Sequence, residues 1–159
     1  MITTNSSKFG SVLAISISER RGIKKKNVKC AELKEAFGIV NDAHAGRWHR
    51  QVSFLAIESM QKIKDKGLNV VPGDFAENIC MEGIDINKIK VGTRIMIGDG
   101  PILEVTQIGK KCHERCHIYY SVGDCVMPKE GIFTRVMTGG RIKPGDRVFI
   151  GDLKDESFD

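Results

Sequence analysis

Short runs in which apolar and polar residues alternate recur along this chain. Strand side chains point to opposite faces in turn, so such a run buries one face and exposes the other. Turn-forming pairs separate several of the runs: Asp99-Gly100, Gly139-Gly140 and Pro144-Gly145. The pattern predicts strands over 11–18, 94–98, 102–106, 132–137 and 146–150. Short strands at this close spacing favour a β-barrel.

One segment has helical spacing instead. Its apolar residues fall close to one helical face: Leu55, Ile57, Met60 and Ile63. Ser53 is a suitable N-cap residue, and Gly67 can end a helix. We therefore expect a helix over 53–66 that packs its apolar face against the rest of the molecule.

Length and composition indicate a globular protein. A chain of 159 residues can bury one core, and 41% hydrophobic with 28% charged residues is typical of folded domains. No apolar run approaches the roughly 20 residues that a membrane span needs. The polar opening at 1–10 lacks the apolar centre of a secretory signal. We expect a single domain over 1–159, in the cytoplasm, without membrane contact.

The net charge of +5 raises the question of an anionic partner. Only one basic run is dense, at 20–26, and it lacks the interleaved aromatic residues of a platform for single-stranded nucleic acid. We expect a solvated or disordered loop there. Contact with an anionic ligand or partner is the alternative, and a nucleic-acid site is disfavoured.

The five cysteines are an odd number, which argues against a complete disulfide framework and favours reduced thiols. Three of them, Cys112, Cys116 and Cys125, lie in one histidine-containing stretch. Cys30 and Cys80 lie far from it in apolar or strand-like surroundings, so we expect both to be packing residues.

Cys112 is the best candidate for a reactive thiol. Cations within three residues stabilise a thiolate, and they are Lys110, Lys111, His113 and Arg115. Cys116 is the rival candidate, and buried packing is the alternative for both. A zinc site with Cys112, Cys116 and a histidine, or a redox-active disulfide between cysteines of this stretch, is also compatible with the spacing.

Several blocks of residues stand in order between about residues 10 and 151. They are 38–46 followed by 49–52, then 72–79 with 82–84 and 91–92, and last 131–136 with 139–146. In this order they resemble the MOSC domain, the molybdenum-cofactor sulfurase C-terminal domain. The resemblance implies a mainly β fold, an antiparallel β-barrel of the pyruvate-kinase-barrel type with a few short helices.

The same resemblance implies a function with the molybdenum cofactor, a molybdopterin. The family's reactive cysteine ligates molybdenum or carries sulfane sulfur as a persulfide, and by order along the chain Cys112 matches it. Lys111 stands where other branches have proline, which keeps Cys116 as a rival. Asn41 stands where glycine usually precedes Asp42.

The resemblance also points to residues that would bind the cofactor. His44, His49 and Arg50 would form part of the pocket that holds the pterin phosphate, and a loop held together by its own polar side chains is the alternative. Trp48 would be a loop anchor or a rim residue. Glu77 and Asn78 form a second loop signature, for which a local structural role is the alternative. Three further cations could add positive potential to the cleft: Lys129, Arg135 and Arg141.

A sulfur carrier would need a cysteine desulfurase or sulfurase as donor and a molybdoenzyme as acceptor. Pyridoxal phosphate would belong to the partner sulfurase, because no lysine here stands in a Schiff-base motif. The alternative is a molybdenum-dependent reductase of N-hydroxylated compounds with a separate electron donor, since the chain shows no iron–sulfur, flavin or dinucleotide motif. A non-catalytic zinc or thiol interaction module is the third hypothesis.

Overall fold

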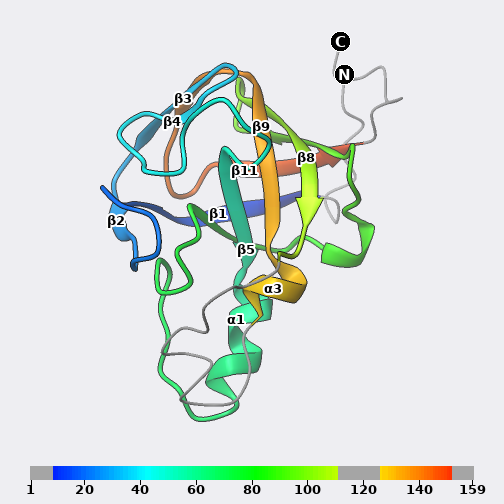
Figure 1. Ribbon diagram of the computed structural model, residues 1–159. Helices are drawn as coiled ribbons and strands as arrows, with labels where there is room; N and C mark the ends of the chain where they lie inside the picture. The colour runs from blue at the N-terminus through cyan, green and yellow to red at the C-terminus, as the bar shows by residue number, and fades with distance from the viewer. Residues whose placement is uncertain (1–8, 111–125, 152–159) are drawn as a thin grey trace.

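The structure is a computed structural model that describes residues 9–110 and 126–151. Strands are the main regular structure of the described chain, and the α-helices lie at one end (Figure 1). The strands are β1 (Phe9–Ile17), β2 (Lys26–Val28), β3 (Ala31–Lys34), β4 (Gly38–Ile39), β5 (Val52–Ala56), β6 (Ile79–Glu82), β7 (Arg94–Ile97), β8 (Ile102–Ile108), β9 (Ile132–Thr138), β10 (Gly140–Ile142) and β11 (Arg147–Gly151). The helices are α1 (Ile57–Lys64), the short 3₁₀ helix η2 (Ile86–Lys88) and α3 (Met127–Glu130).

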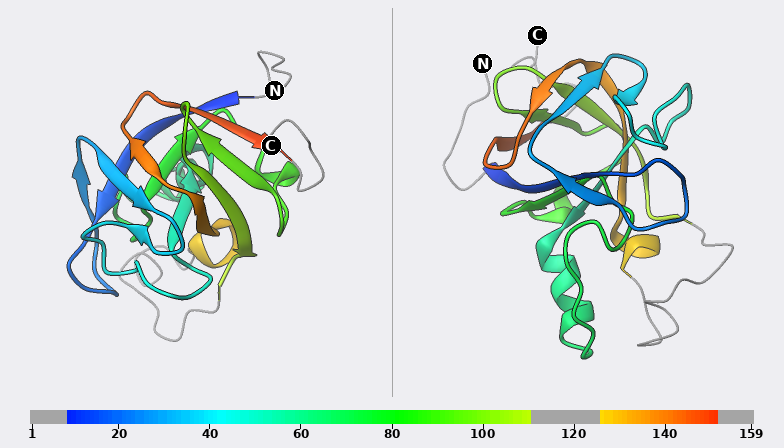
Figure 2. Two further views of the ribbon diagram at one scale, coloured as in Figure 1. Left: turned by 90° about the horizontal axis from the view of Figure 1, so that it is seen from above. Right: turned by 90° about the vertical axis from the view of Figure 1, so that its left-hand side faces the viewer.

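The main sheet closes into a barrel, as the alternating pattern predicts. Neighbouring strands follow the order β11-β7-β8-β9-β5-β6-β1, and β11 pairs with β1 to complete the ring. The view down the barrel in Figure 2 shows the ring and the small separate sheet β10-β3-β4 beside it. All pairs are antiparallel except β5 with β6. Closure leaves no free edge in the ring, and β2 extends the sheet beyond β1.

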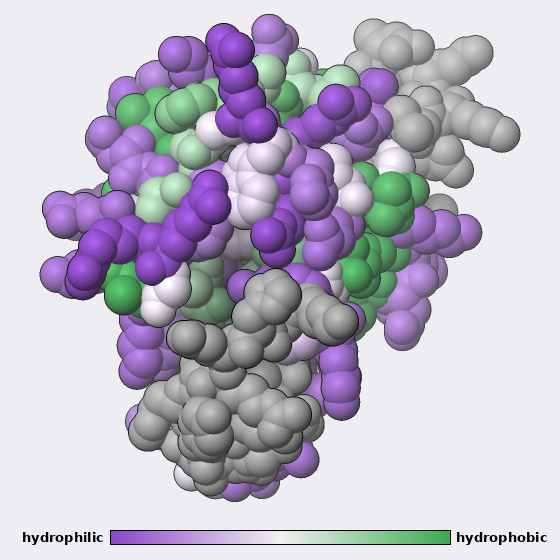
Figure 3. Space-filling model, in the orientation of Figure 1, coloured by the Kyte–Doolittle hydropathy of each residue, from purple (hydrophilic) through white to green (hydrophobic). Residues whose placement is uncertain are grey.

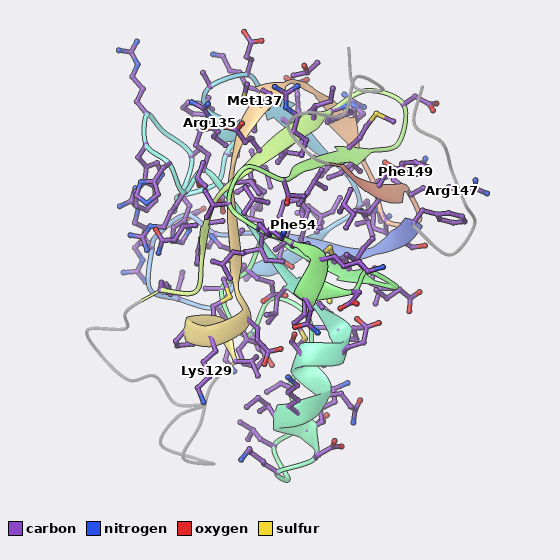
Figure 4. The ribbon with its side chains drawn as sticks, turned by 90° about the vertical axis from the view of Figure 1, so that its right-hand side faces the viewer. Phe54, Lys129, Arg135, Met137, Arg147 and Phe149 are labelled. Carbon is purple, nitrogen blue, oxygen red and sulfur yellow. The ribbon has the colours of Figure 1, made fainter. Side chains whose placement is uncertain are left out.

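Two apolar clusters hold this arrangement together. The first fills the barrel interior, with Phe54 at its centre in Figure 4, and includes Ile15, Ile95 and Leu103. The second lies between the barrel and the helices α1 and α3, and its members include Leu55, Met60, Ile63, Met127 and Phe133. Because β5 contributes Phe54 to one cluster and Leu55 to the other, it is buried on both faces.

The predicted helix over 53–66 is wrong in its first turn. Residues 52–56 form β5, and α1 begins at Ile57 with Ala56 as N-cap residue. Ser53 does not cap the helix, since its hydroxyl donates to the Asn78 side chain at 3.3 Å. A strand buried on both faces is continuously apolar, and the spacing of its residues cannot distinguish it from a buried helix. The packing face is confirmed, with Met60 and Ile63 fully buried.

Asn41 stands where the family that the sequence resembles usually has glycine, and it has a φ of 73°. This is the left-handed region, where glycine is unstrained and asparagine is the next best tolerated residue. The substitution therefore keeps the turn that leads into Asp42.

The cysteine predictions have different outcomes. Cys80 is buried in the second cluster, as predicted, and burial raises the pKa of its thiol to about 12. Cys30 is exposed, because it lies in the short connection between β2 and β3, so the packing prediction for it is wrong. Cys112, Cys116 and Cys125 lie outside the described residues.

Candidate functional site

A buried carboxylate organises the loops at one side of the barrel. Asp42 Oδ1 accepts hydrogen bonds from the Lys25 Nζ at 2.7 Å and from the Ser18 backbone N–H at 3.1 Å. Its second oxygen, Oδ2, accepts the His44 backbone N–H at 3.1 Å. Asp42 thus joins the end of β1, the basic loop and the loop after β4.

Lys25 is fully buried in this cluster, although it belongs to the basic run expected to be a solvated loop. That expectation holds for its neighbours Lys24 and Lys26, which are exposed, and fails for Lys25. The buried ammonium is tolerated because it is paired with Asp42 and fully hydrogen-bonded. One of its contacts is with His44 Nδ1, at 2.9 Å.

His44 is neutral at physiological pH. Burial lowers its pKa to about 4, and the positive charges of Lys25, Arg21 and Lys110 act in the same direction. Asp42 opposes them, because a carboxylate favours the imidazolium. The net effect is a neutral ring that lies close to several cations.

Trp48 is the centre of the loop that follows. Its indole Nε1–H donates to the His44 carbonyl at 2.7 Å, which confirms its predicted role as a loop anchor. The His44 ring stacks on it with a centroid distance of 6.4 Å and an interplanar angle of 9°. The guanidinium carbons of Arg21 and Arg50 lie 4.3 and 4.6 Å from its ring centroid. We call His44, Trp48, Arg50 and Arg21 the Trp48 site.

Arg50 has unused hydrogen-bonding capacity in this site. Its Nε is buried and has no hydrogen-bond partner among the described residues. The guanidinium also lies 5.6 Å from the Phe133 ring, which Lys110 approaches to 6.0 Å. A buried N–H without an acceptor is costly, so an orphan donor among cations fits an anionic ligand group such as a phosphate.

His49 faces a neighbouring groove. Its Nε2 contacts Gln107 Oε1 at 2.7 Å, while Gln107 donates through its amide nitrogen to the Gly109 carbonyl at 2.7 Å. The amide oxygen is therefore the acceptor, and His49 donates from Nε2. The groove runs over the outer face of β8 and β9, where Arg135 pairs with Glu104 at 2.8 Å. Hydrophilic side chains cover most of the described part of the face seen in Figure 3.

Glu77 and Asn78 do not line this site. Both are completely buried, and their side chains bind the backbone. Glu77 accepts the N–H groups of Gly73 at 2.8 Å and Phe75 at 3.2 Å, and Asn78 ties Ser53 to the Ser16 carbonyl. The link to the site is indirect: the Gly73 carbonyl accepts the Lys25 backbone N–H at 2.9 Å.

The structure thus brings His44, His49 and Arg50 together around Trp48, and places Arg135 in the adjoining groove. Lys129 on α3 lies at the helical end of the barrel, away from Arg135 in Figure 4. Arg141 lies on β10 in the small sheet.

Sequence reasoning missed Lys25 and Asp42 as parts of the site. Asp42 has one signal in the sequence, because it directly follows Asn41, and asparagine is a residue that tolerates the left-handed turn found there. Lys25 has none, because nothing in the run distinguishes it from Lys24 and Lys26.

The reactive-cysteine predictions fall on residues that the structure does not describe. The ends of that stretch are described and lie together, with the Lys110 N–H donating to the Pro128 carbonyl at 3.0 Å. Among the described residues, no three histidine, cysteine or acidic side chains are grouped as metal ligands would be. In the same part of the chain, no helix has the length and apolarity to cross a membrane.

A family model described as the MOSC domain matches residues 41–149. Among solved structures, the YuaD protein of Bacillus subtilis has a TM-score of 0.76 at 18% identity, over 91% of this chain and 96% of that one. YiiM from Geobacillus stearothermophilus has a TM-score of 0.66 at 16% identity, over 93% and 78%. YiiM from Escherichia coli has 0.61 at 15%, over 89% and 70%. No match was found among curated proteins. The fold agrees with these structures, and the family match extends over most of the chain, so this chain belongs to the MOSC domain family.

Proposed function

We propose that this MOSC domain binds the molybdenum cofactor, with the Trp48 site holding the anionic end of the pterin. The observation that carries the proposal is the buried, unpartnered Nε of Arg50 beside the neutral His44. Among the described residues, Arg50 and Arg21 bring positive charge to this site, where they lie on the Trp48 ring. The carboxylate of Asp42 is committed to Lys25 and to backbone N–H groups.

This chemistry suits a phosphate better than a neutral ligand. Guanidinium groups offer paired N–H donors in the plane that phosphate oxygens accept, and Arg50 and Arg21 both lie on Trp48. Arg135 is less suited, since Glu104 already neutralises it at 2.8 Å. His49 at the groove would contact a part of the ligand beyond the phosphate.

Cys112 would supply the thiol chemistry. It follows Lys110 by two residues in the sequence, and Lys110 lies near both His44 and Phe133. Bound cofactor would supply a molybdenum centre that the Cys112 thiolate ligates. As a sulfur carrier, the thiolate would attack the outer sulfur of a donor persulfide. The donor S–S bond breaks, a new one forms on Cys112, and the donor cysteine leaves as thiolate.

That step requires a cysteine desulfurase or sulfurase, which would hold the pyridoxal phosphate, and a molybdoenzyme acceptor. The reductase alternative uses the same cofactor site and a separate electron donor. Reduction of a hydroxylamine by cofactor-loaded protein with an electron donor would favour the reductase.

The first experiment measures molybdenum and pterin in protein purified from molybdenum-sufficient cells. The variants are Cys112→Ser, Cys116→Ser and Arg50→Gln, and Arg141→Gln on the small sheet is the control for charge. We expect Arg50→Gln to lower the pterin content about tenfold, the loss expected from one charge-assisted hydrogen bond. Arg141→Gln should leave it unchanged.

Molybdenum lost with Cys112→Ser and kept with Cys116→Ser would support ligation by Cys112. A persulfide on Cys112 after incubation with a cysteine desulfurase and cysteine, detected by mass spectrometry, would support sulfur carriage. Absence of metal and pterin even after addition of free cofactor would contradict the cofactor proposal.

A further inference from the structure

The Lys25 ammonium uses all of its hydrogen-bond donors inside the protein. It contacts Asp42 Oδ1 at 2.7 Å, Ser18 Oγ at 2.9 Å and His44 Nδ1 at 2.9 Å. The Ser18 hydroxyl donates its own proton to the Arg20 carbonyl at 2.8 Å, so it accepts from Lys25. An ammonium has three N–H donors and no acceptor, and three acceptors meet it here.

This contact determines where His44 carries its proton. Because an ammonium cannot accept a hydrogen bond, Nδ1 must offer its lone pair to Lys25, and the ring proton must be on Nε2. The ring is also held from its backbone, since the His44 N–H donates to Asp42 Oδ2 and its carbonyl accepts from Trp48 Nε1. Among the described residues, Nε2 has no hydrogen-bond partner, and about a fifth of the side chain is exposed (22%).

We propose that Lys25 is a positioning residue that holds His44 as the neutral Nε2–H tautomer, so that the Trp48 site presents a fixed hydrogen-bond donor to its ligand. The tautomer follows from the contacts alone. Only the identity of the ligand group rests on the proposed function.

The surrounding charges act in the same sense. Lys25, Arg21 and Lys110 oppose a positive charge on His44. Among the described residues, Asp42 is the acidic group that acts on the ring, and it is paired with Lys25. Protonation of Nδ1 would also break the contact with Lys25 and place two cations 2.9 Å apart. The donor therefore keeps its protonation state across the range in which a free histidine titrates, about pH 5 to 8.

The arrangement determines what the site can select. A fixed N–H beside guanidinium groups binds a ligand atom with a lone pair, such as a phosphate oxygen, and leaves an N–H or O–H of a ligand without an acceptor. Binding would then proceed without proton uptake by His44. A histidine that exchanged tautomers would accept either kind of ligand group.

The test is nitrogen-15 NMR of the histidine rings, with His44 assigned by its loss in His44→Gln. In the unmodified protein we expect Nδ1 at the unprotonated position, Nε2 protonated, and neither signal changing between pH 5.5 and pH 8. His49, which is exposed, is the internal comparison. A proton on Nδ1, or titration of His44 with an ordinary histidine midpoint, would overturn the proposal.

Variants separate positioning from general stability. Lys25→Met with Asp42→Asn removes the ion pair as a unit and avoids an unpaired buried charge. In this double variant His44 should show both tautomers, because no ammonium then requires the lone pair of Nδ1. Its pKa should stay below the usual value, because burial, Arg21 and Lys110 still oppose the charged ring. Lys25→Arg, which also has donors only, should keep Nδ1 unprotonated. If His44 kept its proton on Nε2 alone in a folded double variant, the role of Lys25 would be overturned.

Sulfate distinguishes this proposal from the proposed function, because its charge is constant over this pH range. Adding sulfate should shift the Nε2–H signal of His44 if the site binds anions. A fixed tautomer with no shift would contradict anion binding at the Trp48 site and leave the Lys25 assignment intact.

Discussion

At the scale of single residues, the site depends on ionisable side chains that are buried in the folded protein. Lys25 and Asp42 have fully buried side chains. The desolvation penalty of two buried charges is offset only when they pair and make further hydrogen bonds. Glu77 is also completely buried, and burial raises its pKa to about 7 against the backbone N–H groups that favour its charged form. Each of these residues is ordinary by sequence, and its surroundings determine its charge.

Glu77 should make stability depend on pH. Between pH 4.5 and about 7 the folded state keeps the Glu77 proton that the unfolded state releases. The folded state then binds more protons, so the free energy of unfolding falls as pH rises through this window and is constant above it. A shift of this size corresponds to about 3 kcal/mol.

The measurement is denaturant unfolding at pH 4.5, 6 and 7.5 for the unmodified protein and Glu77→Gln. The variant loses one acceptor at every pH, so its own cost is constant. The free energy of unfolding of the unmodified protein minus that of Glu77→Gln should fall by about 3 kcal/mol from the lowest to the highest pH. An equal difference at all three values would show that Glu77 titrates normally.

At the scale of elements, the loop before β6 packs closely against the basic loop at 20–26. Gly73 has a φ of 101°, and a Cβ there would overlap the Lys25 carbonyl oxygen. The two segments are also joined by the hydrogen bond from the Lys25 N–H to the Gly73 carbonyl at 2.9 Å. Close approach of two backbones is the reason for glycine at this position.

Gly67 provides a matched comparison, because its φ is 99° and nothing lies within 4 Å of a Cβ built on it. Gly67→Ala should cost about 1 kcal/mol, the strain of a left-handed alanine. Gly73→Ala should cost about 3 kcal/mol or more, since overlap with the Lys25 backbone adds to the same strain. Denaturant unfolding of both variants measures the difference. Equal costs would mean that the two backbones can separate freely.

At the scale of the whole molecule, the barrel sets the distance between loops that are far apart in sequence. Ser18 directly follows β1, and Asp42 lies in the loop after β4. Gln107 on β8 and Phe133 on β9 lie on the same side of the barrel as these loops. The interior cluster keeps these strands in register.

Two residues of β1 test how much stability the interior provides. Ile15 is completely buried and Leu13 is 37% exposed. Ile15→Ala should lower the free energy of unfolding by about 2–5 kcal/mol through lost burial and the cavity left behind. Leu13→Ala should cost less than about 1 kcal/mol. Similar losses for the two variants in denaturant unfolding would contradict a core centred inside the barrel.

The sequence by itself determined the family, the barrel and five of its strands, which are β1, β7, β8, β9 and β11. Period-two alternation and glycine-containing turns are local properties, so the strands at 11–18, 94–98, 102–106, 132–137 and 146–150 could be read directly. The loop with His44, Trp48, His49 and Arg50 was also identified, because motif order along the chain does not depend on tertiary contacts.

Only the tertiary structure decided which polar residues are buried and what they contact. Val52 to Ala56 became a strand because β6 and β9 flank it, which no local spacing reveals. Lys25 became a buried partner of Asp42 and His44 while its lysine neighbours stayed in water. Burial and pairing arise between segments distant in sequence, and they fix the charge and proton position that the site presents to a ligand.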